Sequence, residues 1–191
     1  MADFHELVDF FKESGAAGVD HTEGTYLGHC AGVYRDMKRW GFSEELAQAG
    51  LFHSIYGTGI FQKFGLDLAR RDEVRAMIGD HAENVAYLFC AMDYDTFDEN
   101  LDRDAPPYSM IDRFTGERIE MTPQQFEDVV RVQLVDWLEQ LPRGKRWDRR
   151  REAYRKMAER IGPKAVAEYE RVYALEAAPS SSVSKNLRES R

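Results

Sequence analysis

The sequence has few of the residues that mark several classes of protein. It contains only 2 cysteines among 191 residues, and Cys30 and Cys90 each lie among apolar residues, so we expect reduced, buried thiols and no disulfide scaffold. No apolar run approaches the roughly 20 residues that a membrane helix requires. The first residues, MADFHELVDFFKES, are acidic where a secretory signal is basic. We therefore expect a cytoplasmic protein.

Basic residues are outnumbered by acidic ones. The chain has 26 Lys and Arg against 34 Asp and Glu, which gives a net charge of −8. A chain of this sign repels phosphate backbones and anionic lipids. We therefore expect no nucleic acid and no membrane among its partners, and predict a small-molecule substrate. A pair of helices predicted after Pro142 offers a face for a homodimer.

What the sequence does have is apolar residues at intervals of three and four, the period of an α-helix. The acidic stretch 93–104 is predicted to be a surface loop, and MIDRFTGERIEM (110–121) a small β-hairpin, the one strand pair expected. The fold class is therefore all-α: a single-domain helical bundle over residues 1–175 with a hairpin insertion, followed by a disordered tail over 176–191. The predicted helices cover about 4–15, 24–40, 43–57, 71–92, 122–141, 148–161 and 163–175.

Two histidines and one aspartate are candidates for a common site. His29 lies midway along one predicted helix and His53 near the end of the next, so an antiparallel pair of helices brings both imidazoles together. Asp136 lies in an apolar helix, RVQLVDWLEQL, where an ionised carboxylate is costly unless it meets a cation or hydrogen-bond donors. Metal sites need such groups to converge. The alternatives are packed core histidines, and an Asp136 paired with an arginine of RGKRWDRRR.

The segments around these residues resemble a known superfamily. TYLGHC around His29, EELAQAGLFHS around His53, the helix RRDEVRAMIGDHAENV and VQLVDWLEQ around Asp136 are similar, in this order, to the motifs of HD-domain metal-dependent phosphohydrolases. The nearest similarity is to the hydrolase domain of the alarmone synthetase/hydrolases, over about residues 20–141. The resemblance implies an HD-like bundle, one divalent ion, Mn²⁺ or Fe²⁺, held by His29, His53 and Asp136, and hydrolysis of a phosphoester by metal-activated water.

One position departs from the superfamily pattern. Ser54 stands where the superfamily has the Asp of its His-Asp pair, and the acidic pair that assists the attacking water corresponds to positions near Gly57 and Thr58. Three functions therefore stay open. The first is phosphoester hydrolysis; the second is a mononuclear iron oxygenase with two histidines and one carboxylate; the third is a binding protein that has lost catalysis.

Further residues are candidates for contact with the substrate. Ser54 and Tyr56 belong to the segment HSIYGTG that follows the third predicted helix, and Gln140 lies one turn beyond the candidate carboxylate, so we predict that these three orient the substrate. Thr58, in the same segment, and His21, at the entrance to the second predicted helix, are predicted to contact the substrate or a metal ligand. For His21 an ordinary surface position is the alternative.

Overall fold

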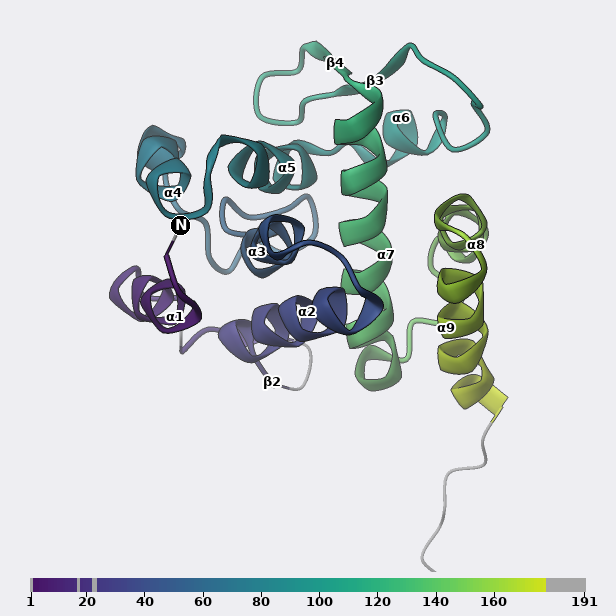
Figure 1. Ribbon diagram of the computed structural model, residues 1–191, viewed down its shortest axis with the longest axis horizontal. Coiled ribbons are helices and arrows are strands. Elements are labelled where there is room, and N and C mark those ends of the chain that lie inside the picture. Colours follow the sequence, from purple (N-terminus) through teal and green to yellow (C-terminus); the bar gives the residue numbers. More distant parts are fainter. Residues whose placement is uncertain (1, 17, 22–23, 178–191) are drawn as a thin grey trace, which may run out of the picture.

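The computed structural model describes residues 2–16, 18–21 and 24–177, and this part of the chain is mostly α-helical, as predicted (Figure 1). Two small antiparallel hairpins, β1 with β2 and β3 with β4, accompany the helices. The α-helices are α1 (Phe4–Glu13), α2 (Tyr26–Trp40), α3 (Glu44–Phe52), α4 (Arg71–Ile78), α5 (Asp80–Ala91), α6 (Tyr94–Asp98), α7 (Pro123–Gly144), α8 (Arg151–Ile161) and α9 (Pro163–Tyr173). The strands are β1 (Asp20–His21), β2 (Gly24–Thr25), β3 (Tyr108–Ile111) and β4 (Arg118–Met121), and two 3₁₀ turns are η1 (Leu68–Arg70) and η2 (Ala174–Ala177).

The long helix α7 runs through the middle of the molecule (Figure 1). It contacts α2, α3 and α5 on one side and α8 and α9 on the other. A helix with neighbours on opposite sides must be apolar on more than one face, and most residues between Phe126 and Leu141 are buried. Thr122 and Gln125 form a capping box at its start, and Pro123 occupies the first helical position, where its missing N–H costs nothing.

Helices α2 and α3 form a tightly packed pair that sets the position of both histidines. Gly41, with φ +93°, ends α2, and the Ser43 side chain caps α3 by accepting a hydrogen bond from the Leu46 amide. The two helices approach closely at Gly50, where an added Cβ would lie 3.0 Å from Cγ of Met37. Because the connection is short, the start of α2 lies beside the end of α3, as the antiparallel prediction required.

Several helix boundaries differ from the prediction. The helix expected over 43–57 ends at Phe52, and the helix expected from residue 148 begins at Arg151. The helix expected over 71–92 is two helices, because Gly79 adopts φ +87° and ψ 160°, a conformation that interrupts the helical hydrogen bonds between α4 and α5. The helix expected to stop at Pro142 continues to Gly144 and ends at Lys145, which has φ 50°. A proline removes one helical hydrogen bond, and the last turn tolerates that loss.

Two further predictions were wrong in detail. The acidic stretch 93–104 was expected to be a loop, but it contains α6, which docks through the fully buried ring of Phe97. The acidic neighbours also support this helix, because Asp93 caps it through the Thr96 amide and Asp98 pairs with Arg150. The hairpin β3–β4 confirms the strand pair expected over 110–121, yet it is not alone, since β1 and β2 also pair.

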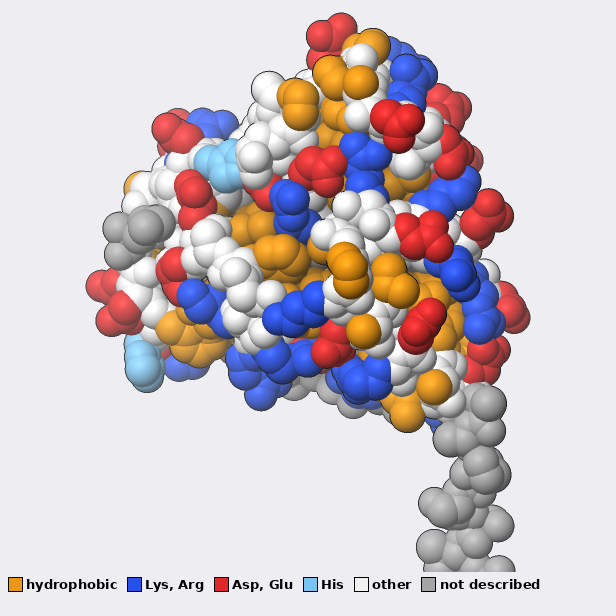
Figure 2. All heavy atoms as spheres, turned by 45° about the vertical axis from the view of Figure 1, so that its right-hand side comes forward, with side chains coloured by type: hydrophobic (Ala, Val, Ile, Leu, Met, Phe, Trp, Pro, Cys, Tyr) orange, Lys and Arg blue, Asp and Glu red, His pale blue; other side chains and the backbone are white. Residues whose placement is uncertain are grey.

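The predicted tail over 176–191 falls outside the described residues, apart from Glu176 and Ala177 at the end of η2. Both cysteines are free and buried, as expected. No helix in the described ranges combines the length and apolar character needed to cross a bilayer. On the face drawn in Figure 2, basic side chains are interspersed with acidic ones, and hydrophobic side chains lie between them.

Candidate metal centre

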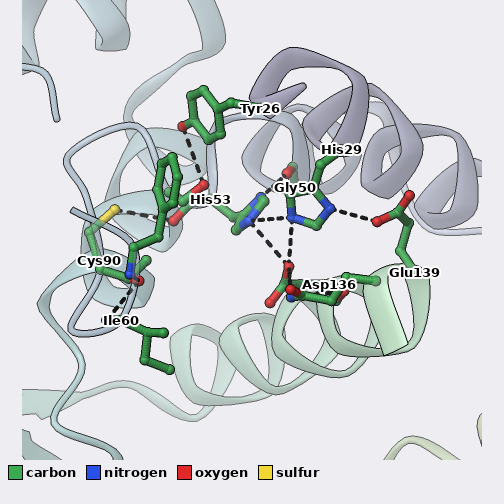
Figure 3. Close-up of polar contacts among 12 residues, drawn as sticks. Tyr26, His29, Gly50, His53, Ile60, Cys90, Asp136 and Glu139 are labelled. Carbon is green, nitrogen blue, oxygen red and sulfur yellow. Dashed lines mark hydrogen bonds and ion pairs between the residues drawn. The ribbon is translucent and has the colours of Figure 1, made fainter. Parts of the chain in front are cut away.

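The side chains of His29, His53 and Asp136 meet at one point (Figure 3). Nε2 of His29 lies 2.9 Å from Oδ1 of Asp136 and 3.3 Å from Nε2 of His53. Nε2 of His53 lies 3.3 Å from the same Oδ1. Three helices, α2, α7 and the end of α3, thus deliver two nitrogen donors and one oxygen donor to a buried position, with each residue at most 6% exposed.

Two hydrogen bonds, one of the imidazole and one of the backbone carbonyl, fix the orientation of His53. Its Nδ1–H donates to the Gly50 carbonyl over 2.7 Å, and its own carbonyl accepts from the Cys90 thiol over 3.1 Å. Since a carbonyl only accepts, Nδ1 carries the proton of the neutral ring and Nε2 offers its lone pair to the centre. Burial raises the pKa of Cys90 to about 12, so its thiol keeps the proton that it donates.

His29 is held by a second carboxylate on the opposite side of its ring. Nδ1 lies 2.6 Å from Oε2 of Glu139, and the guanidinium of Arg143 donates to the same oxygen over 2.6 Å. Glu139 reaches His29 because α2 has no side chain at Gly32, where an added Cβ would lie 2.5 Å from Oε1 of Glu139. A histidine oriented in this way by a carboxylate is a common arrangement around protein-bound metals.

Without an ion, a proton balances these two carboxylates. Burial lowers the pKa of His29, but hydrogen bonds to Asp136 and Glu139, together with their charges, outweigh it and raise the pKa to about 9. Burial would raise the pKa of Asp136, yet the hydrogen bond from Nε2–H of the protonated His29 and the charge of that ring hold it well below its usual range. A cation bound at the centre would take the place of the proton on Nε2 of His29.

The spacing of the three donor atoms suits a metal ion. Two ligands at about 2.1 Å from one ion are about 3.0 Å apart at an octahedral angle and about 3.4 Å apart at a tetrahedral angle. The observed separations of 3.3 and 3.3 Å fall in this range, and the third, 2.9 Å, is close to the octahedral value. Two imidazoles and one carboxylate are ligands that divalent transition metals accept. The buried His29, His53 and Asp136 group can therefore hold a metal ion, whose identity the donors leave open.

A cavity of about 210 Å³ opens beside the three donors. His21 forms part of its wall and stacks on His29, with ring centroids 4.4 Å apart and planes 8° apart. Burial and the charge of His29 lower the pKa of His21 to about 4, so the stacked ring is neutral. The wall consists of Asp20, His21, His29, His53, Ser54, Thr58, Ile60, Phe61, Lys63, Phe89, Tyr94, Gln133, Asp136, Trp137, Gln140, Arg146, Arg149 and Tyr154.

Three of the residues predicted to contact the substrate or a metal ligand line this cavity in addition to His21. Ser54 donates to the hydroxyl of Tyr26 over 3.2 Å, and does not join the donor group. Thr58 accepts from the amide of Phe61 over 2.9 Å, which closes a local turn. Gln140 donates to Oδ1 of Asp136 over 3.0 Å, so it supports a metal ligand directly.

Tyr56 lies elsewhere: it is not among the residues of the cavity wall, and its hydroxyl donates to Glu83 over 2.9 Å. Glu83 is fully buried, and its carboxylate also accepts from Arg71 over 2.6 Å and from Arg75 over 3.1 Å. Burial and the negative charge of Glu83 raise the pKa of Tyr56 well above its usual value, so the phenol stays protonated. This arrangement anchors the segment after α3 to α4 and α5.

Sequence reasoning missed several residues of the site. Glu139 was absent from the predicted set, although its spacing of three residues from Asp136 on one helix places both on the same face and could have revealed it. Gln133, one turn before Asp136, lines the cavity with its Oε1 buried and without a partner among the described residues. Tyr94 and Lys63 also line the cavity, but nothing in the sequence pattern marks either residue as part of a site.

Comparison with known proteins adds one match. A family model described as a domain of unknown function (DUF6817) matches residues 10–94. This range holds His29 and His53 but ends before Asp136, and it covers less than half of the chain. No curated protein matches the chain. No solved structure matches it either.

Proposed function

We propose that this protein is a metal-dependent enzyme that hydrolyses a phosphoester-type small molecule in the cavity beside His29, His53 and Asp136. The observation that carries the proposal is the convergence of the three donor atoms, at 2.9 to 3.3 Å from one another, on the wall of a cavity. The order and content of the surrounding motifs, which resemble the HD-domain phosphohydrolases, supply the reaction type.

Each residue of the candidate centre has a separate role in the proposed reaction. Nε2 of His29, Nε2 of His53 and Oδ1 of Asp136 hold the ion. When bound, a divalent ion acts as a Lewis acid that lowers the pKa of water and stabilises negative charge on the ester oxygens. Oδ2 of Asp136 has no hydrogen bond to the described residues, so it is free to accept a proton from the attacking water. Water adds to phosphorus and gives a proton to Oδ2 of Asp136, the P–O bond to the leaving group breaks, and the leaving oxygen takes up that proton.

The cavity wall favours this chemistry by limiting access of solvent. Phe89 and Trp137 are buried, and the ring of Phe61 packs at 4.7 Å from that of His21. Apolar walls strengthen the electrostatic interactions between the centre and a bound ester. The volume of about 210 Å³ is below the roughly 300–1,000 Å³ of pockets that enclose drug-sized ligands. It therefore suits a small molecule or one end of a longer one.

Ser54 supports a centre with one ion. At this position the HD-domain phosphohydrolases have an aspartate, whereas the Ser54 hydroxyl is a weak neutral ligand, so we do not expect a bridged pair of ions. The Ser54 hydroxyl also donates its hydrogen bond to the Tyr26 hydroxyl, and not to a residue of the donor group. We propose Mn²⁺ or Fe²⁺ as the ion, because imidazoles with a carboxylate suit both.

The same three donor residues are also compatible with a second function. Two histidines and one carboxylate with open positions are the ligand set of mononuclear iron(II) oxygenases. In that case the centre binds iron and consumes O₂ together with a small organic substrate. Oxygen uptake by protein loaded anaerobically with Fe²⁺, tested with organic substrates, distinguishes this reaction from hydrolysis, which consumes none.

The test starts from protein purified without chelator. Elemental analysis should find close to one metal ion per chain, and reconstitution with Mn²⁺ should give release of p-nitrophenol from p-nitrophenyl phosphate or bis(p-nitrophenyl) phosphate. His53→Ala should abolish metal uptake and hydrolysis. His5→Ala, a change to an exposed histidine on α1, should leave both unchanged. Less than about 0.2 ion per chain after reconstitution contradicts the proposal and favours a binding protein without catalysis.

A further inference from the structure

Three cationic side chains line the cavity without an ionic partner among the described residues. Lys63 belongs to the segment between α3 and η1, and Arg146 and Arg149 belong to the connection between α7 and α8. Lys63 and Arg146 are exposed, whereas Gln133 and Trp137 are buried, so the cations occupy the outer part of the cavity. No salt bridge within the described ranges involves any of the three.

The neighbouring arginines show what is unusual about this group. In the same basic stretch of sequence, Arg143 pairs with a carboxylate of α7, Arg150 with one of α6 and Arg151 with one of η2. With a net charge of −8, the chain has more acidic side chains than Lys and Arg side chains to pair with them. The two arginines without such a partner are those that border the cavity, which indicates that their partner is something that enters it.

The charges at the cavity mouth match a doubly charged anion. Asp20 is the one carboxylate of the cavity wall besides Asp136 among the described residues, so the mouth carries three cations and one anion, a net charge of about +2. A phosphate monoester carries about −1.5 to −2 at neutral pH. The Arg149 amide donates to the Arg146 carbonyl over 3.1 Å, and the side chains on both sides of this turn line the same cavity. Arginine pairs suit the oxygens of phosphate.

Gln133 gives an independent indication that the cavity is completed by a ligand. It is 1% exposed, and its Oε1 is buried without a partner among the described residues. A buried polar atom that lacks a hydrogen bond costs about 1–3 kcal/mol unless a ligand or a water satisfies it. Gln133 lies one turn from Asp136 on α7 and lines the same cavity as the donor group and the three cations.

We propose that Lys63, Arg146 and Arg149 form a subsite for a phosphate group of the substrate, separate from the bond that reacts at the metal centre. The substrate is then a small molecule with a terminal phosphate held at the mouth, and its reactive group faces His29, His53 and Asp136. Binding of the anion depends only on the three cations; the assignment of this anion to a substrate rests on the proposed function.

The experiment measures binding of inorganic phosphate to the full chain by isothermal titration calorimetry. Arg146→Gln combined with Arg149→Gln should weaken phosphate binding at least about tenfold, because two charged hydrogen-bonding groups are lost. Arg155→Gln combined with Arg171→Gln makes the same change in net charge at exposed arginines of α8 and α9 and serves as the control. Acetate, with a single charge, should bind more weakly than phosphate to the unmodified chain.

A second variant separates this subsite from the metal centre. His53→Ala removes a metal ligand and should leave phosphate binding within about twofold, since the cations lie apart from the donor group. Equal phosphate binding by the Arg146/Arg149 variant and its control overturns the subsite. Loss of binding in His53→Ala alone also overturns it, because the anion then binds at the metal. If phosphate binding depends on the arginines but no phosphoester is hydrolysed, the subsite stands and the proposed function fails.

Discussion

Glu139 accepts a hydrogen bond from Nδ1 of His29 over 2.6 Å, across the interface of α7 with α2. The contact fixes the plane of the imidazole and keeps a proton on Nδ1, so that Nε2 points at Asp136 and His53 (Figure 3). Arg143 donates to the same carboxylate oxygen over 2.6 Å. The orientation of one candidate metal ligand therefore depends on a residue outside the donor group.

Glu139→Gln should weaken metal binding by about 10- to 100-fold, because the amide is a weaker acceptor and no longer favours the charge on the ring. Competition of the protein with a chelating dye for Mn²⁺ measures the change. The matched control is Glu127→Gln, which removes a carboxylate of the same helix that pairs with Arg160. Unchanged affinity in Glu139→Gln would show that His29 keeps its orientation without this contact.

Gly32→Ala should also weaken metal binding, because the new Cβ occupies the place of the Glu139 carboxylate, 2.5 Å from Oε1. If the effect passes through Glu139, it should disappear in a Glu139→Ala background, where the clashing atoms are gone. A double-mutant cycle of Mn²⁺ affinities measures this coupling. Additive effects of the two substitutions would mean that Gly32 acts on the helix packing alone.

The affinity for the ion should rise with pH. In the metal-free protein the pKa of His29 is raised to about 9, so Nε2 holds a proton at neutral pH that the ion must displace. The affinity should increase about tenfold per pH unit until about pH 9 and then level off, with release of one proton. Calorimetry with Mn²⁺ in buffers of different ionisation enthalpy at pH 7.0 and 8.5 counts the proton. A flat affinity over this range contradicts the raised pKa.

Tyr56→Phe should reduce stability by about 1 kcal/mol, because the buried hydrogen bond to Glu83 is lost while both arginines still bind that carboxylate. Metal affinity and hydrolysis should stay unchanged, since the phenol is not part of the cavity wall. Urea unfolding measures the first quantity and the p-nitrophenyl assay the second. Lost activity at full stability would place the hydroxyl at the substrate instead.

The sequence by itself determined the helical architecture and the three donors of the candidate centre. Helix formation follows from local rules, such as apolar spacing and the caps at Ser43 and Thr122. These rules depend only on residues close to one another in the sequence. His29, His53 and Asp136 were recognisable because each is a polar group on an apolar helical face, and a buried polar group needs a partner.

Only the tertiary structure decided which side chains complete the site. Whether Glu139 or another acid meets His29 depends on how α2 and α7 cross, and residues 110 positions apart reveal no such contact in sequence. The same holds for Tyr56. Its position close to His53 in the sequence made it a candidate, but in the folded chain its hydroxyl donates to Glu83. Local periodicity fixes the face of a helix, whereas the relative placement of helices fixes which faces meet, and that placement is a property of the whole packed core.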